Sequence, residues 1–199
     1  VKKNFTCFYT TYHKSIAEYG FQQITIGFHG TYGQKILYNS KLLFDDQFTP
    51  FGVTGVTQDI FNIANLNINY FDVNAGIIYT GSTNDQNNFY IGASMYHINR
   101  PKESFKGGNW NIAARTTISG GGYFPVSEQL TLNTSGIYQA QNTSSEVTFG
   151  GAIAAAIDPQ SESHSNIYIG SWFRVRAAIL PYLGLEFAGV RIGSLSVFT

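Results

Sequence analysis

Charged side chains recur on one face of several alternating segments, and this pattern is the first that could carry chemistry. Arg115, Arg174, Glu186 and Arg191 each lie on the polar side of a segment whose other side is apolar. If the last three segments pair as hairpins, we expect Arg174, Glu186 and Arg191 to lie side by side. Such a charge cluster could select ions in a pore. We favour mutual neutralisation inside a filled interior instead.

Catalytic and metal-binding patterns are weak. The histidines at positions 13, 29, 97 and 164 are scattered and lack metal-ligand spacing. A hydrolase would need a nucleophile and a base on one face. Ser94 and His97 are three residues apart on one expected strand, so they point to opposite faces. We predict no catalytic residue, no metal and no cofactor.

The elements that position these residues are β-strands, because apolar and polar residues alternate almost throughout. In the stretch FDVNAGIIYT, for example, Phe71, Val73, Ala75, Ile77 and Tyr79 oppose a more polar set. We expect about ten antiparallel strands in a single all-β domain over residues 1–199, at roughly 3–16, 22–36, 70–82, 88–99, 111–124, 129–140, 145–157, 166–176, 181–188 and 190–198. Most exceed the ~5–6 residues typical of soluble strands and match the ~9–11 of tilted transmembrane strands.

Composition agrees with a membrane location. Only 12% of residues are charged, against roughly 25% in soluble domains, yet no stretch reaches the ~18 consecutive apolar residues of a membrane-spanning helix. Composition alone leaves a soluble β-sandwich open. The alternation of short links with long ones at 37–69 and 100–110 favours an antiparallel transmembrane β-barrel of the bacterial outer membrane, in contact with lipid and lipopolysaccharide. The net charge of zero predicts no nucleic-acid partner.

Four sequence pieces resemble the PorP/SprF family of outer-membrane barrels of the type IX secretion system. They are GQKILYNSKLLFDDQF from position 33, FDVNAGIIYT from 71, FYIGASMYHINRPKESF from 89 and GSWFRVRAAILPYLGLEF from 170. The resemblance covers nearly the whole chain. It implies a non-enzymatic role in exporting or anchoring a secreted surface protein, notably an adhesin of gliding motility, beside periplasmic components of the machinery.

The most specific piece of the resemblance is the expected strand end at His97, Ile98, Asn99, Arg100 and Pro101. Pro101 cannot donate a backbone hydrogen bond, so we expect strand pairing to stop there. Arg100 could bind a cargo carboxylate or a lipopolysaccharide phosphate bidentately. It could equally be an interfacial side chain that extends toward water. These residues are therefore candidate partner or interface contacts.

Two departures from the family concern the extent of the barrel. The family usually has further strands before the region that matches Asn4, and it tends to place Tyr-Asp where this chain has Ser194 and Leu195 after Gly193. We therefore expect the ten strands to be part of a larger barrel. The alternative functions are a passive porin or channel and a structural barrel or outer-membrane enzyme.

Overall fold

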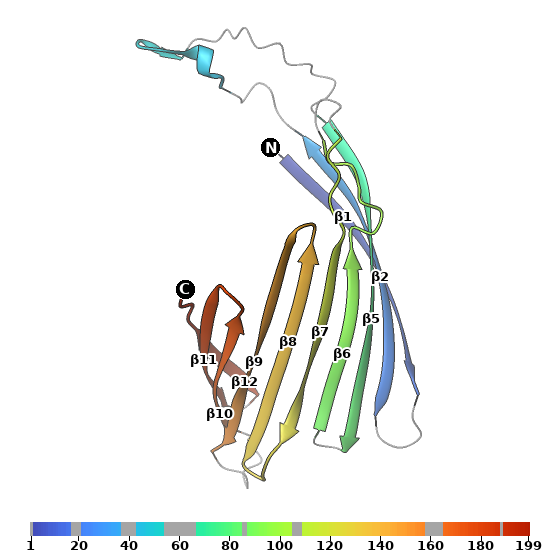
Figure 1. Ribbon diagram of the computed structural model, residues 1–199, viewed down its shortest axis with the longest axis vertical. Helices are drawn as coiled ribbons and strands as arrows, with labels where there is room; N and C mark the ends of the chain where they lie inside the picture. Colours follow the sequence, from blue (N-terminus) through green and yellow to red (C-terminus); the bar gives the residue numbers. More distant parts are fainter. Residues whose placement is uncertain are drawn as a thin grey trace.

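A computed structural model describes residues 2–16, 21–36, 43–53, 67–84, 87–104, 109–157, 165–187 and 189–199. In these residues the protein is all-β, and ten strands form one antiparallel sheet in the order β1-β2-β5-β6-β7-β8-β9-β10-β11-β12. Figure 1 shows this sheet as a curved wall, with its outermost strands β1 and β12 drawn faintly because they lie further from the viewer. The expected all-β antiparallel fold is confirmed.

The strands are mostly long, as the alternation predicted. Their bounds are β1 Lys2–Ser15, β2 Gln22–Ile36, β5 Asn67–Asn84, β6 Asn87–Tyr96, β7 Arg115–Pro125, β8 Leu130–Gln141, β9 Ser144–Ala156, β10 Asn166–Arg174, β11 Ala178–Phe187 and β12 Val190–Leu195. A 3-10 turn at Asp45–Gln47 precedes two short strands, β3 Phe48–Thr49 and β4 Gly52–Val53, which pair with each other.

The sheet has two chemically different faces, because successive residues of a strand point to opposite sides. Paired positions such as Ile26 with Ile77 and Ile77 with Ala93 extend one apolar row across β2, β5 and β6. Many large apolar side chains on this side are exposed, including Phe28, Ile91 and Ile153. We call this apolar side the outer face and the opposite side the inner face.

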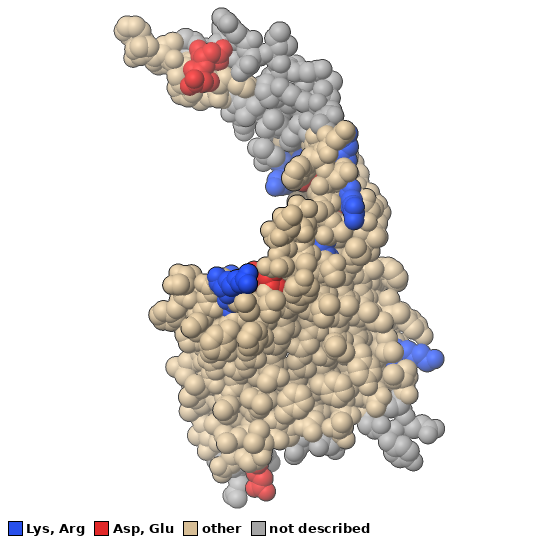
Figure 2. All heavy atoms as spheres, in the orientation of Figure 1, with Lys and Arg blue, Asp and Glu red and all other residues tan. Residues whose placement is uncertain are grey.

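The inner face is polar, and it carries every charged residue of strands β2 to β12. These residues are Lys35, Asp72, Arg115, Glu146, Arg174, Glu186 and Arg191. A Lys or Arg on a lipid-facing strand position costs about 2–4 kcal/mol at mid-depth. The segregation of charge therefore matches a wall whose outer face meets lipid. In Figure 2 the visible charged atoms gather toward the ends of the strands, and a broad uncharged band separates them.

The inner face is the concave one. The most buried strand residues, among them Thr31, Asp72, Asn74 and Ala152, all point to it. At Gly150 and Gly170 an added Cβ would collide with backbone oxygens of the adjacent strands. No large side chain in the described residues is fully buried, so this part of the chain has no closed hydrophobic core of its own.

The largest difference from the predicted elements lies between β6 and β7. We expected strands at 88–99 and 111–124, but β6 ends at Tyr96 and β7 begins at Arg115. His97 and Arg100 adopt positive φ angles of 55° and 46°, a conformation that L residues outside turns rarely adopt. Strand pairing therefore ends several residues before Pro101, because of the turn and not because of the proline.

The connections are unequal at the two ends of the sheet, as expected. Residues 37–66 and 97–114 connect strands at one end, which also carries the short turns 142–143 and 175–177. At the other end the links are short except for residues 157–165. Among the described residues, no helix is long and apolar enough to cross a membrane.

Candidate functional site on the inner face

Five polar or aromatic residues form a row across neighbouring strands of the inner face, and we call it the polar row: Tyr9, His29, Asn74, Tyr96 and Arg115. The Tyr9 and His29 rings stack with 4.4 Å between their centroids and an interplanar angle of 6°. Asn74 Nδ2 lies 3.2 Å from His29 Nδ1. Arg115 Cζ lies 4.4 Å from the centroid of the Tyr96 ring. The row brings together β1, β2, β5, β6 and β7.

A buried acid lies beside the polar row. Asp72 is only 6% exposed, and its Oδ2 atom lies 3.0 Å from His97 Nδ1 and 3.4 Å from Asn74 Nδ2. Asp72 Oδ1 is buried and has no hydrogen-bond partner within the described residues. His97 Nδ1 is also without a hydrogen bond there, so its approach to Asp72 is an ion-pair distance with poor hydrogen-bond geometry. Leaving a buried polar atom unpaired is costly, so this cluster is incompletely satisfied.

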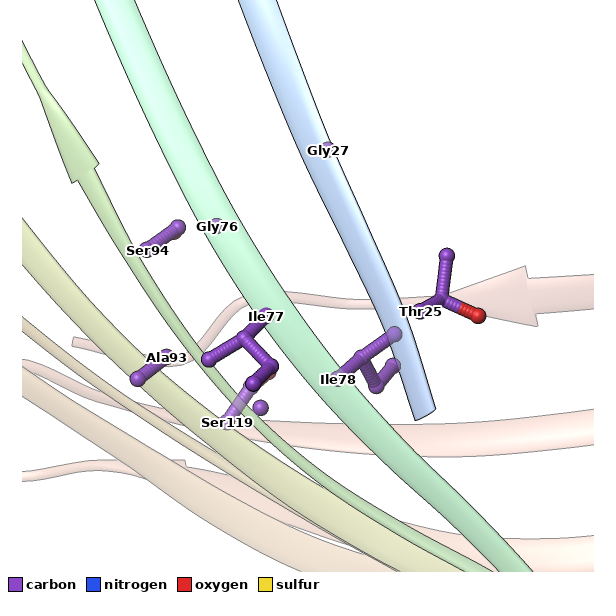
Figure 3. A pocket seen from close by; sticks show the side chains of 9 residues that line it. Thr25, Gly27, Gly76, Ile77, Ile78, Ala93, Ser94 and Ser119 are labelled. Atoms are coloured by element: carbon purple, nitrogen blue, oxygen red, sulfur yellow. The ribbon is translucent and has the colours of Figure 1, made fainter. Parts of the chain in front are cut away.

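A shallow groove runs along the inner face next to the polar row. It consists of two hollows of about 270 Å³ and 250 Å³, and both are lined by Gly27, Gly76 and Ser94. These three residues are in register across β2, β5 and β6. Figure 3 shows them with Ser119 as short or absent side chains. The second hollow also reaches His29, Asn74 and Tyr96 of the polar row.

The groove exists because its floor lacks bulk. A Cβ added at Gly76 would lie 3.0 Å from Ser94 Cβ, and one added at Gly92 would lie 3.2 Å from the Ile77 carbonyl oxygen. Both positions are therefore tight against the adjacent strand, and small residues keep the surface low. The groove has an uncharged floor and a polar border, and such a surface can hydrogen-bond an extended polypeptide or a sugar without needing a fixed charge pattern.

The turn after β6 fastens the long 97–114 connection to β5. The Asn99 side chain accepts a hydrogen bond from the Val73 backbone N–H at 3.1 Å and donates one to the Phe71 carbonyl oxygen at 2.6 Å. The Asn99 side chain thus makes the two hydrogen bonds to β5 that the backbone of a neighbouring strand would otherwise make. Pro101 is buried and its carbonyl oxygen accepts from Ile112 N–H at 3.0 Å. Arg100 is exposed.

This geometry gives the predicted contact residues different surroundings. His97 touches the buried Asp72, Asn99 holds the backbone of β5, and Pro101 is buried, whereas Arg100 projects from the surface. Arg100 and Asn99 are both exposed, but the Asn99 amide is already bonded to β5, which leaves Arg100 as the side chain most available to another molecule. Its role in binding stays a prediction.

The predicted charge cluster is divided over three places. Glu186 and Arg191 are directly paired across β11 and β12, with 2.9 Å between Glu186 Oε2 and Arg191 Nη2. Arg174 lies at the opposite end of β10 and pairs with Glu146 at 3.4 Å. Its expected place beside Glu186 is corrected, because β10 pairs with β11 so that Asn166, not Arg174, is opposite Glu186. Arg115 is four strands away from Glu186 in the order of the sheet.

The Glu186 pair is part of a self-contained cluster with Tyr168. The Tyr168 hydroxyl donates to Glu186, and the Arg191 guanidinium lies 4.0 Å from the centroid of the Tyr168 ring. Asn166 Nδ2 adds a contact of 3.5 Å to the same carboxylate. Tyr168 is 5% exposed. Every charged member of this cluster has its partner within it.

Sequence reasoning missed His29, Asp72 and Asn74 as site residues. The signal that could have found them is their position on the polar side of otherwise apolar strands. Their mutual contact depends on the pairing of β2 with β5, which are separated by residues 37–66. Within the described residues, no group of three His, Cys, Asp or Glu residues is arranged to hold a metal ion.

These observations define a β-sheet membrane protein, with an apolar face for lipid and a polar, concave face. A family model described as the type IX secretion system membrane protein PorP/SprF matches residues 3–198. The chain therefore belongs to the PorP/SprF family, as its sequence resemblance indicated, and is an outer-membrane component of the type IX secretion system. No curated protein and no solved structure matches it.

Proposed function

We propose that this protein binds a secreted surface protein, such as an adhesin, along the groove of its inner face. The observation that carries the proposal is the groove itself: an uncharged floor of Gly, Ser and Thr residues together with Ile78, bordered by the polar row. Membership of the type IX secretion system supplies the class of partner, a polypeptide that the system exports. The role is one of binding and anchoring, without catalysis.

The chemistry of the groove supports a polypeptide. Main-chain N–H and C=O groups need hydrogen-bond partners wherever water is excluded. Ser94, Ser119 and Thr25 offer hydroxyl groups along the floor, and each hydroxyl can both donate and accept. Glycine positions allow a second backbone to come close. Contact with periplasmic components of the machinery and with lipopolysaccharide belongs to the same proposal, with the exposed Arg100 as a candidate contact.

Filling the groove tests the proposal. Ser94→Trp places a large ring on the groove floor, whereas Met95→Trp places the same ring on the outer face of the same strand, at a residue that lines neither hollow. We expect S94W to reduce the secreted protein at the cell surface at least about tenfold and M95W to leave it unchanged. Equal assembly of both variants in the outer membrane is the control. Normal surface display in an assembled S94W variant would contradict the proposal.

The passive porin is the competing function, and conductance separates it. A porin reconstituted in a planar bilayer should conduct ions, and filling the groove with S94W should reduce that current. We expect no steady conductance from the protein purified together with its bound partner. Open-channel current from that complex would favour the porin.

A further inference from the structure

One inner-face charge differs from all the others in strands β2 to β12. Lys35 pairs with Glu103, Asp72 with His97, Glu146 with Arg174, and Glu186 with Arg191. Arg115 has no acidic partner within the described residues, where its side chain contacts the Tyr96 ring instead. Its Nε atom is buried and lacks a hydrogen-bond partner in the same part of the chain.

The position of Arg115 is fixed although its charge is not neutralised. The guanidinium rests on the Tyr96 ring at 4.4 Å from the ring centroid, a cation–π contact that orients it. Arg115 is directly opposite Tyr96 in the pairing of β6 with β7. Tyr96 in turn lines the hollow of about 250 Å³ that also reaches Ser94. Arg115 lines neither hollow itself, but its guanidinium, which has no acidic partner in the described residues, rests on Tyr96 at the edge of the groove.

We propose that Arg115 is the carboxylate-binding residue of the groove and takes an Asp or Glu side chain, or the terminal carboxylate, of the bound polypeptide. A planar guanidinium binds a carboxylate through two parallel hydrogen bonds. The phosphates of lipopolysaccharide lie with the lipid, on the other side of the wall, which favours a polypeptide carboxylate at this inner position. The inference rests on the proposed function, because it names a contact within the same groove.

The test places an aliphatic diazirine amino acid, close in size to isoleucine, at Ile78, which lines the groove, and compares variants of the full-length protein in native outer membranes. We expect Arg115→Gln to lower the yield of crosslinked secreted protein about tenfold, which corresponds to about 1.4 kcal/mol. Arg115→Lys should fall between, because an ammonium group keeps the charge but loses the planar fork. Arg176→Gln is the matched control: it removes an exposed arginine from the 175–177 turn, and we expect no change.

The possible failures are distinguishable. If the Ile78 probe captures no secreted protein with Arg115 intact, the proposed function falls and the inference falls with it. If the probe captures the secreted protein equally from the R115Q variant and from the protein that keeps Arg115, at equal assembly, the inference alone is overturned. If R115K lowers the crosslinking yield as much as R115Q, the planar guanidinium group itself is required for recognition, and the inference is supported. Should R115Q not assemble, an unchanged yield with R115K overturns the inference.

Discussion

Two polar clusters occupy the inner face, and they differ in how well they are satisfied. At the β10–β12 side, Glu186 holds Tyr168, Arg191 and Asn166 together, so each charge meets its partner. At the β5–β7 side, Asp72 and Arg115 both keep a buried polar atom without a hydrogen bond in the described residues. The first arrangement stabilises the sheet, and we call it the satisfied cluster. The second, which we call the incomplete cluster, borders the groove. Charged residues of the inner face are therefore either neutralised within their own cluster or left partly unsatisfied next to the groove.

Both clusters lie on the inner face, away from lipid, and two adjacent isoleucines test this assignment most strongly. Both residues border the groove, but the side chain of Ile77 is on the outer face with Ile26, whereas that of Ile78 is on the inner face with Thr25. We expect Ile77→Lys to destabilise the folded protein in lipid vesicles by about 2–4 kcal/mol. Ile78→Lys should cost much less, because its ammonium group stays on the polar side. Urea titration of the reconstituted protein measures both, and the reverse order would refute the assignment of the faces.

Removing one carboxylate from the satisfied cluster has the next largest effect. Glu186→Ala leaves the buried Tyr168 hydroxyl without its acceptor and leaves Arg191 with only the Tyr168 oxygen, and we expect a loss of about 2 kcal/mol in the free energy of unfolding. Arg115→Ala, from the incomplete cluster, should cost no more than about 1 kcal/mol, the value of its contact with Tyr96. The same urea titration compares the two variants. Equal losses would remove the distinction between the clusters.

The turn that connects the incomplete cluster to the 97–114 segment has a smaller, local effect. Asn99→Ala removes the side-chain amide that pairs with Phe71 and Val73, and we expect a cost of about 1 kcal/mol. Hydrogen exchange at the Val73 amide should become faster, while strand amides of β8 stay unchanged. Asn109→Ala is the control, since its side chain accepts from Lys102 and does not reach β5. Unchanged exchange at Val73 in N99A would show that the amide contact is unimportant.

The alternation of the sequence predicted the strands and their two faces, because a period of two is a local property. It also placed Arg115, Arg174, Glu186 and Arg191 on the inner side correctly. The error for Arg174 came from the turn at 175–177, which sets the register of β10 with β11. A local pattern does not determine such a register.

The sequence did not predict the contacts within the polar row. His29 and Asn74 meet although residues 37–66 separate their strands, so their contact follows only from which strands become neighbours. The end of β6 at Tyr96 was also missed. The sequence marks the nearby Pro101 clearly, but the positive φ angles of His97 and Arg100 have no comparable signal.

We propose that the outer face meets lipid while the inner groove holds a secreted polypeptide. Photo-crosslinking residues close in size to the native side chains test this most directly, at Ile78 and Tyr90 on the inner face and at Ile91 and Met95 on the outer face. We expect the secreted protein to be captured from positions 78 and 90, and lipid from positions 91 and 95. Capture of the same molecules from both sets, or of lipid from 78 and 90, would contradict this arrangement.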